Sequence, residues 1–241
     1  MFLKACLNGA RQPLEHPRLP VSAEQLALDA VAVRQLGAQA VHIHAKDEAG
    51  RDTLAASSVG QALTAIRAAA PGLAIGVTTG DWIASTPERL AAIANWQVLP
   101  EFASVNWHEP DAVALAEALL ARGVAVEAGI FHPAAARAWS RWPKRESSTL
   151  RILIELPEGL DAAEVPSAAE EILAILSNSN TQLPMLLHGE GSSCWPAIHY
   201  ALRHGFQLRL GLEDTLELPD GRTAPDNAAL FLALNQLAST G

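Results

Sequence analysis

Two histidines one residue apart and a distant pair of acids are the side chains of this chain best suited to chemistry. His42 and His44 end one apolar run, and Glu213 and Asp214 follow directly after another. Alternate residues of a strand point to the same face, so both imidazoles should project from one side of a strand end. Two imidazoles and one carboxylate are good ligands for a divalent metal with open positions, as catalytic zinc requires. The pattern therefore predicts a metal-dependent enzyme.

An arginine precedes the acidic pair. Arg209 lies four residues before Glu213 and would face the same side if the strand ran on. A buried arginine needs an anionic partner. Two roles stay open for it: an ion pair with Glu213 or Asp214, or binding of a substrate carboxylate, for which its planar fork is suited. Asp214 would point away from the ligand side and either orient Arg209 or act as a base.

Further polar side chains occur where the other apolar runs end. The candidates for substrate contact are Thr78, Thr79, Ser104, Asn106 and Glu127. The threonine pair could offer hydroxyls and a backbone N–H to an oxyanion, or form an ordinary turn. His188 has three open roles: a third histidine ligand, a substrate contact or a hydrogen-bonded structural residue.

Short apolar runs alternate with amphipathic helical stretches along the whole chain. The expected strands are 2–7, 39–44, 73–79, 102–106, 124–130, 150–156, 184–188 and 207–212. The expected helices are 22–36, 59–70, 86–96, 111–122, 134–139, 167–177, 193–204 and 226–237. Ser22 and Gln25 form a capping box at the start of the first helix. The strands are apolar almost throughout, which is typical of strands covered on both faces.

Eight strands alternating with eight helices in 241 residues predict an α/β protein, a single-domain (β/α)8 TIM barrel over residues 1–241. The alternative, a doubly wound open sheet, would need a Gly-rich turn after the first strand, where the chain has residues 8–11, Asn-Gly-Ala-Arg. Active sites of such barrels lie at the carboxyl ends of the strands, and alternate strands share one interior layer. His42, His44 and Glu213 should therefore meet around the end of the first strand.

Composition excludes several classes of function. The net charge of −9 argues against a nucleic-acid partner, because binding phosphate needs a basic surface. Two cysteines are too few for a disulfide framework. No signal peptide is evident, and no stretch reaches the roughly 18 apolar residues of a membrane span. We therefore expect a cytoplasmic protein with no membrane partner.

Taken together, the motifs resemble the β-keto acid cleavage enzyme family (3-keto-5-aminohexanoate cleavage enzyme-like), with this chain as a divergent, short member. The matching segments are Asn8-Gly9-Ala10, residues 19–22 (Leu-Pro-Val-Ser), 41–44 (Val-His-Ile-His) with Asp47 and Gly50-Arg51, 78–80 (Thr-Thr-Gly), 103–106 (Ala-Ser-Val-Asn), 209–214 (Arg-Leu-Gly-Leu-Glu-Asp) and Asn227-Ala228. They run from one end of the chain to the other. The pairing of His-x-His with Arg-x-Gly-x-Glu-Asp is specific.

The resemblance implies a zinc ion held by His42, His44 and Glu213, although other divalent metals suit the same ligands. It implies that Arg209 and Asp214 bind and activate a β-keto acid. Acetyl-CoA would be the co-substrate, and acetoacetate and a new acyl-CoA the products of this acyltransferase. A homo-oligomer is also implied.

The same resemblance places Thr78, Ser104 and Asn106 at substrate-contacting positions. Several positions depart from the family pattern, among them Lys46, where arginine is common, and the loop 157–159, which is usually glycine-rich. Arg11 stands where the family usually carries a glutamate, and Gly129 stands where it carries a second acid of the pocket. These departures predict a substrate with an anionic or neutral side chain rather than an amine.

Two other functions compete with this one. The first is a metal-dependent hydrolase or aldolase on the same barrel. The second is a non-catalytic metal-containing barrel that binds a ligand. Dependence on acetyl-CoA separates the acyltransferase from the hydrolase or aldolase. The fold alone does not decide among the three, because function resides in the site.

Overall fold

The computed structural model describes residues 2–240; Met1 and Gly241, the ends of the predicted domain, lie outside them. The strands are β1 (Leu3–Cys6), β2 (Ala40–Ile43), β3 (Ala74–Val77), β4 (Phe102–Asn106), β5 (Ala125–Ile130), β6 (Thr149–Leu156), β7 (Met185–Gly189) and β8 (Leu208–Leu210). The helices are α1 (Ala23–Gln35), α2 (Ala56–Ala69), α3 (Thr86–Asn95), α4 (Ala112–Ala121), α5 (Pro133–Ser140), α6 (Arg145–Ser148), α7 (Val165–Asn178), η1 (Gly191–Ser193), α8 (Cys194–His204) and α9 (Asn227–Thr240).

The strands form one eight-stranded sheet in the order β7-β6-β5-β4-β3-β2-β1-β8. Neighbouring strands pair in parallel where their register is given, and Cys6 of β1 lies opposite His42 of β2. A parallel bridge between Leu186 and Gln207 also links β7 to the residue before β8, so the order returns to its start. Consecutive parallel strands joined by helices make a (β/α)8 barrel, as predicted. The doubly wound alternative, which needs a reversal of strand order, is excluded.

The chain divides into two compact units. Unit 1 comprises residues 79–90 and 102–208, and unit 2 comprises residues 2–78, 91–101 and 209–240. Each unit has its own buried apolar side chains. The barrel strands of unit 2 bury Ala5, Val41, Ile43 and Ile75, and those of unit 1 bury Val105, Val126, Ile152, Ile154 and Leu187. The prediction of a single domain over 1–241 stays a prediction.

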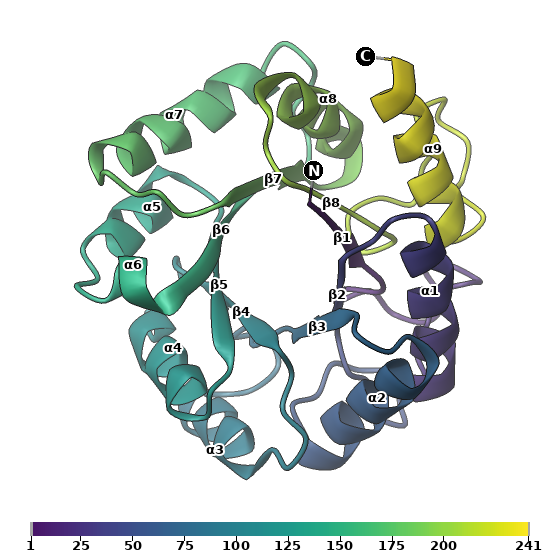
Figure 1. The fold of residues 1–241 in the computed structure, drawn as a ribbon, viewed down its shortest axis with the longest axis vertical. Coiled ribbons are helices and arrows are strands. Elements are labelled where there is room, and N and C mark those ends of the chain that lie inside the picture. The colour runs from purple at the N-terminus through teal and green to yellow at the C-terminus, as the bar shows by residue number, and fades with distance from the viewer. Residues whose placement is uncertain (1, 241) are drawn as a thin grey trace. The chain divides into compact units, whose positions relative to one another are not determined.

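Within unit 2, α1 packs against both α2 and α9 (Figure 1). The capping box predicted at the start of α1 is confirmed: Gln25 N donates to Ser22 Oγ (3.2 Å), and Ser22 N donates to Gln25 Oε1 (2.9 Å). These two bonds satisfy backbone groups that the first turn leaves unpaired. The buried face of α1 includes Leu26 and Val33.

Within unit 1, α7 lies between α5 and α8 (Figure 1). The short helix α6 was not predicted; four residues carry too little periodicity to be recognised. Trp139 of α5 is fully buried, and its indole N–H donates to Thr149 Oγ1 at the start of β6 (3.2 Å). This contact ties the helix to the next strand.

The last strand is shorter than predicted, covering Leu208–Leu210 and not residues 207–212. A Cβ at Gly211 would overlap the carbonyl oxygen of Cys6, so only glycine allows the chain to pass so close to β1. Beyond it, Glu213 N donates to the same Cys6 carbonyl (3.2 Å). The segment that follows β8 is thereby held against the end of β1.

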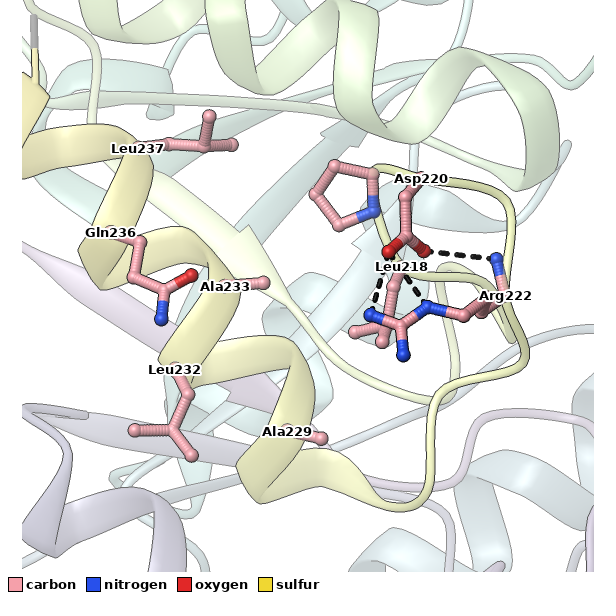
Figure 2. Close-up of a pocket in the computed structure, with 9 residues that line it drawn as sticks. Leu218, Asp220, Arg222, Ala229, Leu232, Ala233, Gln236 and Leu237 are labelled. Atoms are coloured by element: carbon pink, nitrogen blue, oxygen red, sulfur yellow. Dashed lines mark hydrogen bonds and ion pairs between the residues drawn. The ribbon is translucent and has the colours of Figure 1, made fainter.

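A hollow of about 420 Å³ lies between α9 and the loop at 218–222 in unit 2 (Figure 2). Its walls are mostly apolar, with Leu232 half exposed. At its edge Arg222 Nε donates to Asp220 Oδ2 (2.7 Å), and the hydrogen bonds from Arg222 lower the pKa of Asp220. The lining includes no histidine or cysteine, so this hollow is not the candidate catalytic site. Among residues 2–240, no helix is long and apolar enough to cross a membrane.

Candidate metal centre and active site

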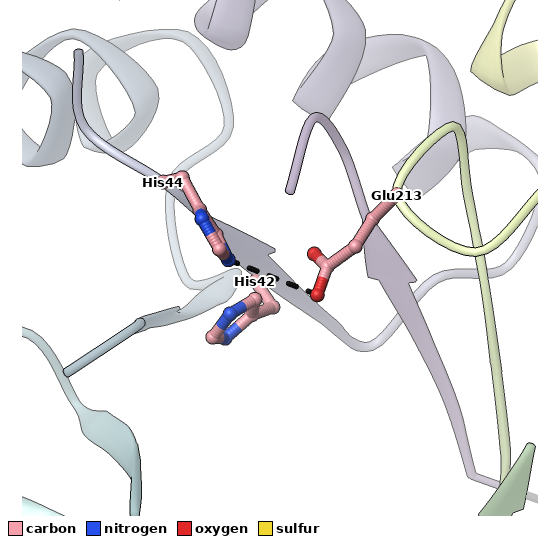
Figure 3. Close-up of side chains that lie close together, drawn as sticks. All are labelled: His42, His44 and Glu213. Atoms are coloured by element: carbon pink, nitrogen blue, oxygen red, sulfur yellow. Dashed lines mark ion pairs between the residues drawn. The ribbon is translucent and has the colours of Figure 1, made fainter. Parts of the chain in front are cut away.

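The predicted ligands meet in unit 2. His42 is on β2, His44 lies just after it, and Glu213 follows β8; one ligand atom from each lies within 4.8 Å of the other two (Figure 3). The imidazole rings are edge to face, with centroids 5.3 Å apart. His42 and His44 are 2% and 3% exposed, and the Glu213 side chain is 13% exposed. The three side chains therefore form a nearly buried group of lone-pair donors.

A carboxylate that the sequence did not single out orients His44. His44 Nδ1 lies 2.8 Å from Asp52 Oδ2, and Asp52 Oδ1 lies 2.5 Å from Lys46 Nζ. An ionised carboxylate only accepts hydrogen bonds, so Nδ1 is the donor in this contact, and in a neutral imidazole the lone pair is then on Nε2. Nε2 faces Glu213 Oε1 at 3.7 Å. This carboxylate–histidine arrangement is typical of metal ligands.

The backbone of His44 is held by one amide side chain. Asn8 Nδ2 donates to His44 O (2.8 Å), and His44 N donates to Asn8 Oδ1 (2.9 Å). Asn8 also donates to Pro20 O (3.0 Å) and is fully buried. Because both polar groups of the His44 backbone are bonded to one amide, the chain beyond β2 has a fixed path.

Glu213 is placed by close approach and by an arginine. A Cβ at Gly9, whose φ is +57°, would lie 2.5 Å from Glu213 Cγ, so the turn after β1 leaves room for this side chain. Arg209 Nη2 donates to Glu213 Oε1 (2.8 Å) and to Asp214 Oδ1 (2.7 Å), and Arg209 Nε donates to Asp214 Oδ1 (2.9 Å). Asp214 is thus the main partner of the guanidinium, one of the two roles that the sequence left open for it.

The donor set fits a metal ion. Glu213 Oε2 is buried and has no hydrogen-bond partner among the described residues. Ligand bonds of 2.0–2.2 Å put neighbouring ligand atoms of a tetrahedral zinc site about 3.4 Å apart. His44 Nε2 and Glu213 Oε1 lie 3.7 Å apart. Two histidines and one carboxylate leave at least one position for water or substrate. His42, His44 and Glu213 would hold such an ion.

A second group of potential ligands shares one member with the first. Cys6, Glu213 and Asp214 also come within 4.8 Å of one another. Burial, the largest cause, raises the pKa of Cys6 well above its ordinary value, and the two carboxylates raise it further. A thiol binds metal as the thiolate, so this group is the poorer site.

The other predicted polar residues lie in different surroundings. Thr78, at the end of β3 in unit 2, is 4% exposed. In unit 1, Thr79 Oγ1 donates to Ser104 O (2.7 Å), and Asn106 Nδ2 donates to Glu109 Oε1 (2.8 Å). Substrate contact by these residues stays a prediction.

Three further residues missed by sequence reasoning, Arg89, Glu109 and Asp111, organise the loops of unit 1. Arg89 donates to Glu109 Oε2 (2.6 Å), to Asp111 Oδ2 (2.6 Å) and to Thr79 O (2.7 Å). Arg89 and Glu109 are 2% and 5% exposed. The arginine lies on a helix and the acids in a loop, so no local pattern pointed to their pairing.

Glu127 lies inside unit 1 as one half of an ion pair. Its Oε1 is 3.0 Å from Arg151 Nε, and the Glu127 side chain is fully buried. Burial lowers the pKa of Arg151, and the charge of Glu127 opposes that shift. This pair supports a structural role for Glu127, and its predicted contact with substrate stays a prediction.

His188 also has a carboxylate partner. It lies on β7 opposite Glu155 of β6, with Nε2 3.2 Å from Glu155 Oε2. A Cβ at Gly129 would lie 2.8 Å from Asn106 Oδ1 and 3.1 Å from Glu155 Oε1, so this glycine leaves room for both side chains. Neither group of potential metal ligands in the described residues includes His188.

The sequence contains one signal for the pairing of Lys46 with Asp52 in unit 2. Asp47 and Gly50 are turn-forming residues between Lys46 and Asp52. In the structure a turn forms there, and an antiparallel bridge joins Lys46 to Asp52. Residues six apart around such a turn lie side by side, so the pairing was accessible from sequence.

Comparison with known proteins identifies the family. The sequence profile of the beta-keto acid cleavage enzyme family matches residues 1–240. The chain belongs to this family. The resemblance that its motifs suggested is therefore confirmed over residues 1–240.

Two relatives within the family carry the same name. The 3-keto-5-aminohexanoate cleavage enzyme of Acetoanaerobium sticklandii is 21% identical over 253 residues, covering 99% of this chain and 91% of that protein. The enzyme of that name from Fusobacterium nucleatum is 22% identical over 255 residues, with the same coverage. This chain is thus a distant member of the family.

Solved structures support the fold. ObcA in a binary complex with oxaloacetate matches with a TM-score of 0.71 and 18% identity, covering 93% of this chain and 64% of that one. ObcA in a ternary complex with a C4-CoA adduct and oxalate matches with a TM-score of 0.72 and 18% identity, covering 93% and 65%. The chain thus spans slightly less than two thirds of the length of ObcA. At this identity the likeness concerns the barrel fold.

Proposed function

We propose that this protein is a zinc-dependent β-keto acid cleavage enzyme that exchanges a β-keto acid with acetyl-CoA, giving acetoacetate and a new acyl-CoA. The observation that carries the proposal is the convergence of His42, His44 and Glu213 within 4.8 Å in a member of this family. The buried Glu213 Oε2, with no hydrogen-bond partner among the described residues, supports a cation at that point.

The reaction requires a carbanion equivalent at the carbon between the carboxylate and the ketone. A zinc ion bound by the three ligands would supply Lewis acidity to the ketone oxygen, which makes the neighbouring C–H acidic. The α-carbon then forms a bond to the acetyl carbonyl carbon, and the thiolate of CoA leaves. That thiolate adds to the original ketone carbon, the bond from this carbon to the α-carbon breaks, and the α-carbon takes back the proton that Asp214 removed. Acetoacetate and acyl-CoA result.

Arg209 and Asp214 are the residues to which we assign activation of the keto acid. The guanidinium of Arg209 suits bidentate contact with the substrate carboxylate. Asp214 is the base that takes the α-proton, because it lies beside the guanidinium that would bind the substrate carboxylate. The hydrogen bonds of 2.7 Å and 2.9 Å from Arg209 to Asp214 fix the carboxylate relative to the guanidinium. Thr78, Thr79, Ser104 and Asn106 remain the proposed substrate-contacting residues.

Arg11 bears on the choice of substrate. Its guanidinium donates to Leu212 O (2.5 Å) and Glu213 O (3.3 Å), and it pairs with Glu15 (3.3 Å). A cation at this position would repel a substrate ammonium group. We therefore propose a β-keto acid whose side chain is neutral or anionic.

Turnover of a panel of β-keto acids tests this function. The zinc-loaded protein should consume acetyl-CoA and form acetoacetate with at least one neutral or anionic member of the panel. Chelation of the metal should abolish the activity, and re-addition of zinc should restore it. Acetoacetate and acyl-CoA are measured together by mass spectrometry.

The competing functions give different results in the same assay. Turnover that does not require acetyl-CoA would replace the acyltransferase with a hydrolase or aldolase. A zinc-loaded protein that turns over no member of the panel would leave the metal-containing binding barrel as the better assignment. Either result overturns the proposal.

A further inference from the structure

We infer that Asp52, Lys46 and Arg11 are positioning residues of the metal centre, which set the spacing between His44 and Glu213. They act together with the turn at residues 8–11, and we call this set the ligand belt. The inference rests on the proposed function, because it assumes that a metal binds at these ligands. All members of the ligand belt lie in unit 2.

The first contact of the ligand belt joins Asp52 to the imidazole ring of His44. Asp52 Oδ2 accepts from His44 Nδ1 (2.8 Å), and Asp52 Oδ1 contacts Lys46 Nζ (2.5 Å). The side chains of Lys46 and Asp52 are 0% and 6% exposed, so water does not replace these contacts. A carboxylate behind a histidine ligand fixes the orientation of the ring and raises the basicity of the other nitrogen. Lys46 supplies the opposite charge that a buried carboxylate needs.

The belt continues from Lys46 into the turn after β1. Lys46 Nζ also donates to Gly9 O (2.7 Å) and Arg11 O (3.0 Å). An ammonium group has three N–H donors, and the two carbonyls and Asp52 use all three. Lys46 therefore cannot move without breaking contacts on both sides, and the position of Asp52 is tied to the path of the turn.

Arg11, at the end of the turn at residues 8–11, holds the segment that carries Glu213. Arg11 Nε donates to Leu212 O (2.5 Å), and Arg11 Nη2 donates to Glu213 O (3.3 Å). The missing Cβ of Gly9 leaves space for Glu213 Cγ. Glu213 is thus held through its backbone by Arg11, while its carboxylate contacts Arg209.

These contacts form one continuous path from the ring of His44 to the backbone of Glu213. His44 and Glu213 belong to segments about 170 residues apart in sequence, so no local geometry sets their distance. A rigid set of supporting contacts reduces the reorganisation that metal binding requires. Loosening the belt should therefore weaken metal binding even though all three ligands remain.

Zinc affinity of belt variants tests this inference. The dissociation constant is measured by competition with a chromophoric chelator, and the visible absorption of the Co²⁺-substituted protein reports the ligand geometry. We expect Asp52→Asn to bind zinc about 10- to 100-fold more weakly and to alter the Co²⁺ spectrum. Asp52→Glu should recover part of the affinity, because it restores the charge.

Asp47→Asn is the matched control. Asp47 lies in the same turn but accepts from Ala49 N and Arg51 N (both 2.9 Å) and pairs with the exposed Arg51. The same change of acid to amide there should leave zinc affinity and the Co²⁺ spectrum unchanged. Thermal unfolding of the metal-free proteins shows whether each variant is folded.

Arg11→Met is the second test variant, at a partly exposed site. It should weaken zinc binding by about 10-fold, the lower end of the range expected for Asp52→Asn.

The outcomes separate this inference from the proposed function. Tight zinc binding by the wild type together with unchanged affinity and Co²⁺ spectra in Asp52→Asn and Arg11→Met would overturn the positioning role and leave the proposed function intact. A wild-type protein that binds no zinc would overturn both. Weaker zinc binding in both variants, with folded metal-free proteins and an unaffected control, supports the ligand belt.

Discussion

Unit 1 buries its carboxylates against cations, whereas unit 2 gathers two imidazoles and a carboxylate around one point. In unit 1, Glu109 lies 2.6 Å from Arg89, and Glu127 lies 3.0 Å from Arg151. In unit 2, His42, His44 and Glu213 present lone pairs within 4.8 Å of one another.

The difference separates polar groups that support the fold from polar groups suited to chemistry. A charge-balanced pair satisfies itself, and its removal affects mainly stability. A group with an excess of lone pairs calls for a cation that the polypeptide does not supply. Unit 2 also contains two such pairs, Arg209 with Asp214 and Lys46 with Asp52. Because these pairs flank the ligands, we expect their removal to affect the chemistry of the site as well as stability. Three predictions test the contrast, from the largest expected effect to the smallest.

Removing a partner from a buried pair in unit 1 should affect stability most. Glu127→Gln leaves the guanidinium of Arg151 without its charged partner, and the free energy of unfolding should fall by about 3 kcal/mol. Urea denaturation measures this change. Zinc affinity of the folded protein should not change.

The exposed pair of Glu117 with Lys144 provides the control within unit 1. Their side chains are 48% and 60% exposed, so Glu117→Gln should cost less than about 1 kcal/mol. Equal destabilisation by the two variants would contradict a special role for buried pairs. A Glu127→Gln protein that is stable but has a raised KM for the keto acid would favour the substrate-binding role predicted from sequence.

Removing a ligand in unit 2 should affect metal binding instead. Glu213→Gln replaces a charged ligand by a neutral one, and zinc affinity should fall by about 100-fold or more, equal to roughly 2.8 kcal/mol. Elemental analysis and chelator competition measure the loss. Asp220→Asn, an exposed acid in the following loop, is the control. Unchanged zinc content in Glu213→Gln would remove this residue from the ligand set.

The smallest effect concerns Cys6, which the structure places in the weaker group of potential ligands. Burial raises the pKa of its thiol, so the reactive thiolate forms only well above the ordinary pH range of a cysteine. We expect no alkylation of Cys6 or Cys194 at pH 8 in the native protein, since both are buried, and alkylation of both after unfolding. Mass spectrometry detects the adducts. Rapid alkylation of Cys6 in the native protein would indicate a thiolate and would favour Cys6, Glu213 and Asp214 as a metal site.

The sequence by itself determined the strand and helix order, the barrel and the three candidate ligands. Apolar runs of strand length, each followed by a helical pattern, are a local signal, and Ser22 with Gln25 marked a helix start that the structure confirms. His42 and His44 needed only the two-residue period of a strand to be assigned to one face.

Tertiary structure alone decided what surrounds those ligands. The contact of Arg11 with the carbonyl of Leu212 joins residues 201 positions apart, and Asn8 reaches His44 across 36. Glu127 was predicted to contact substrate, and only the pairing of β5 with β6 places Arg151 beside it. Such contacts depend on the register between paired strands and on where the chain leaves the sheet. The residues next to a side chain in sequence do not determine either. The sequence therefore specified which groups can bind a cation, and the fold specified which of them are held in place to do so.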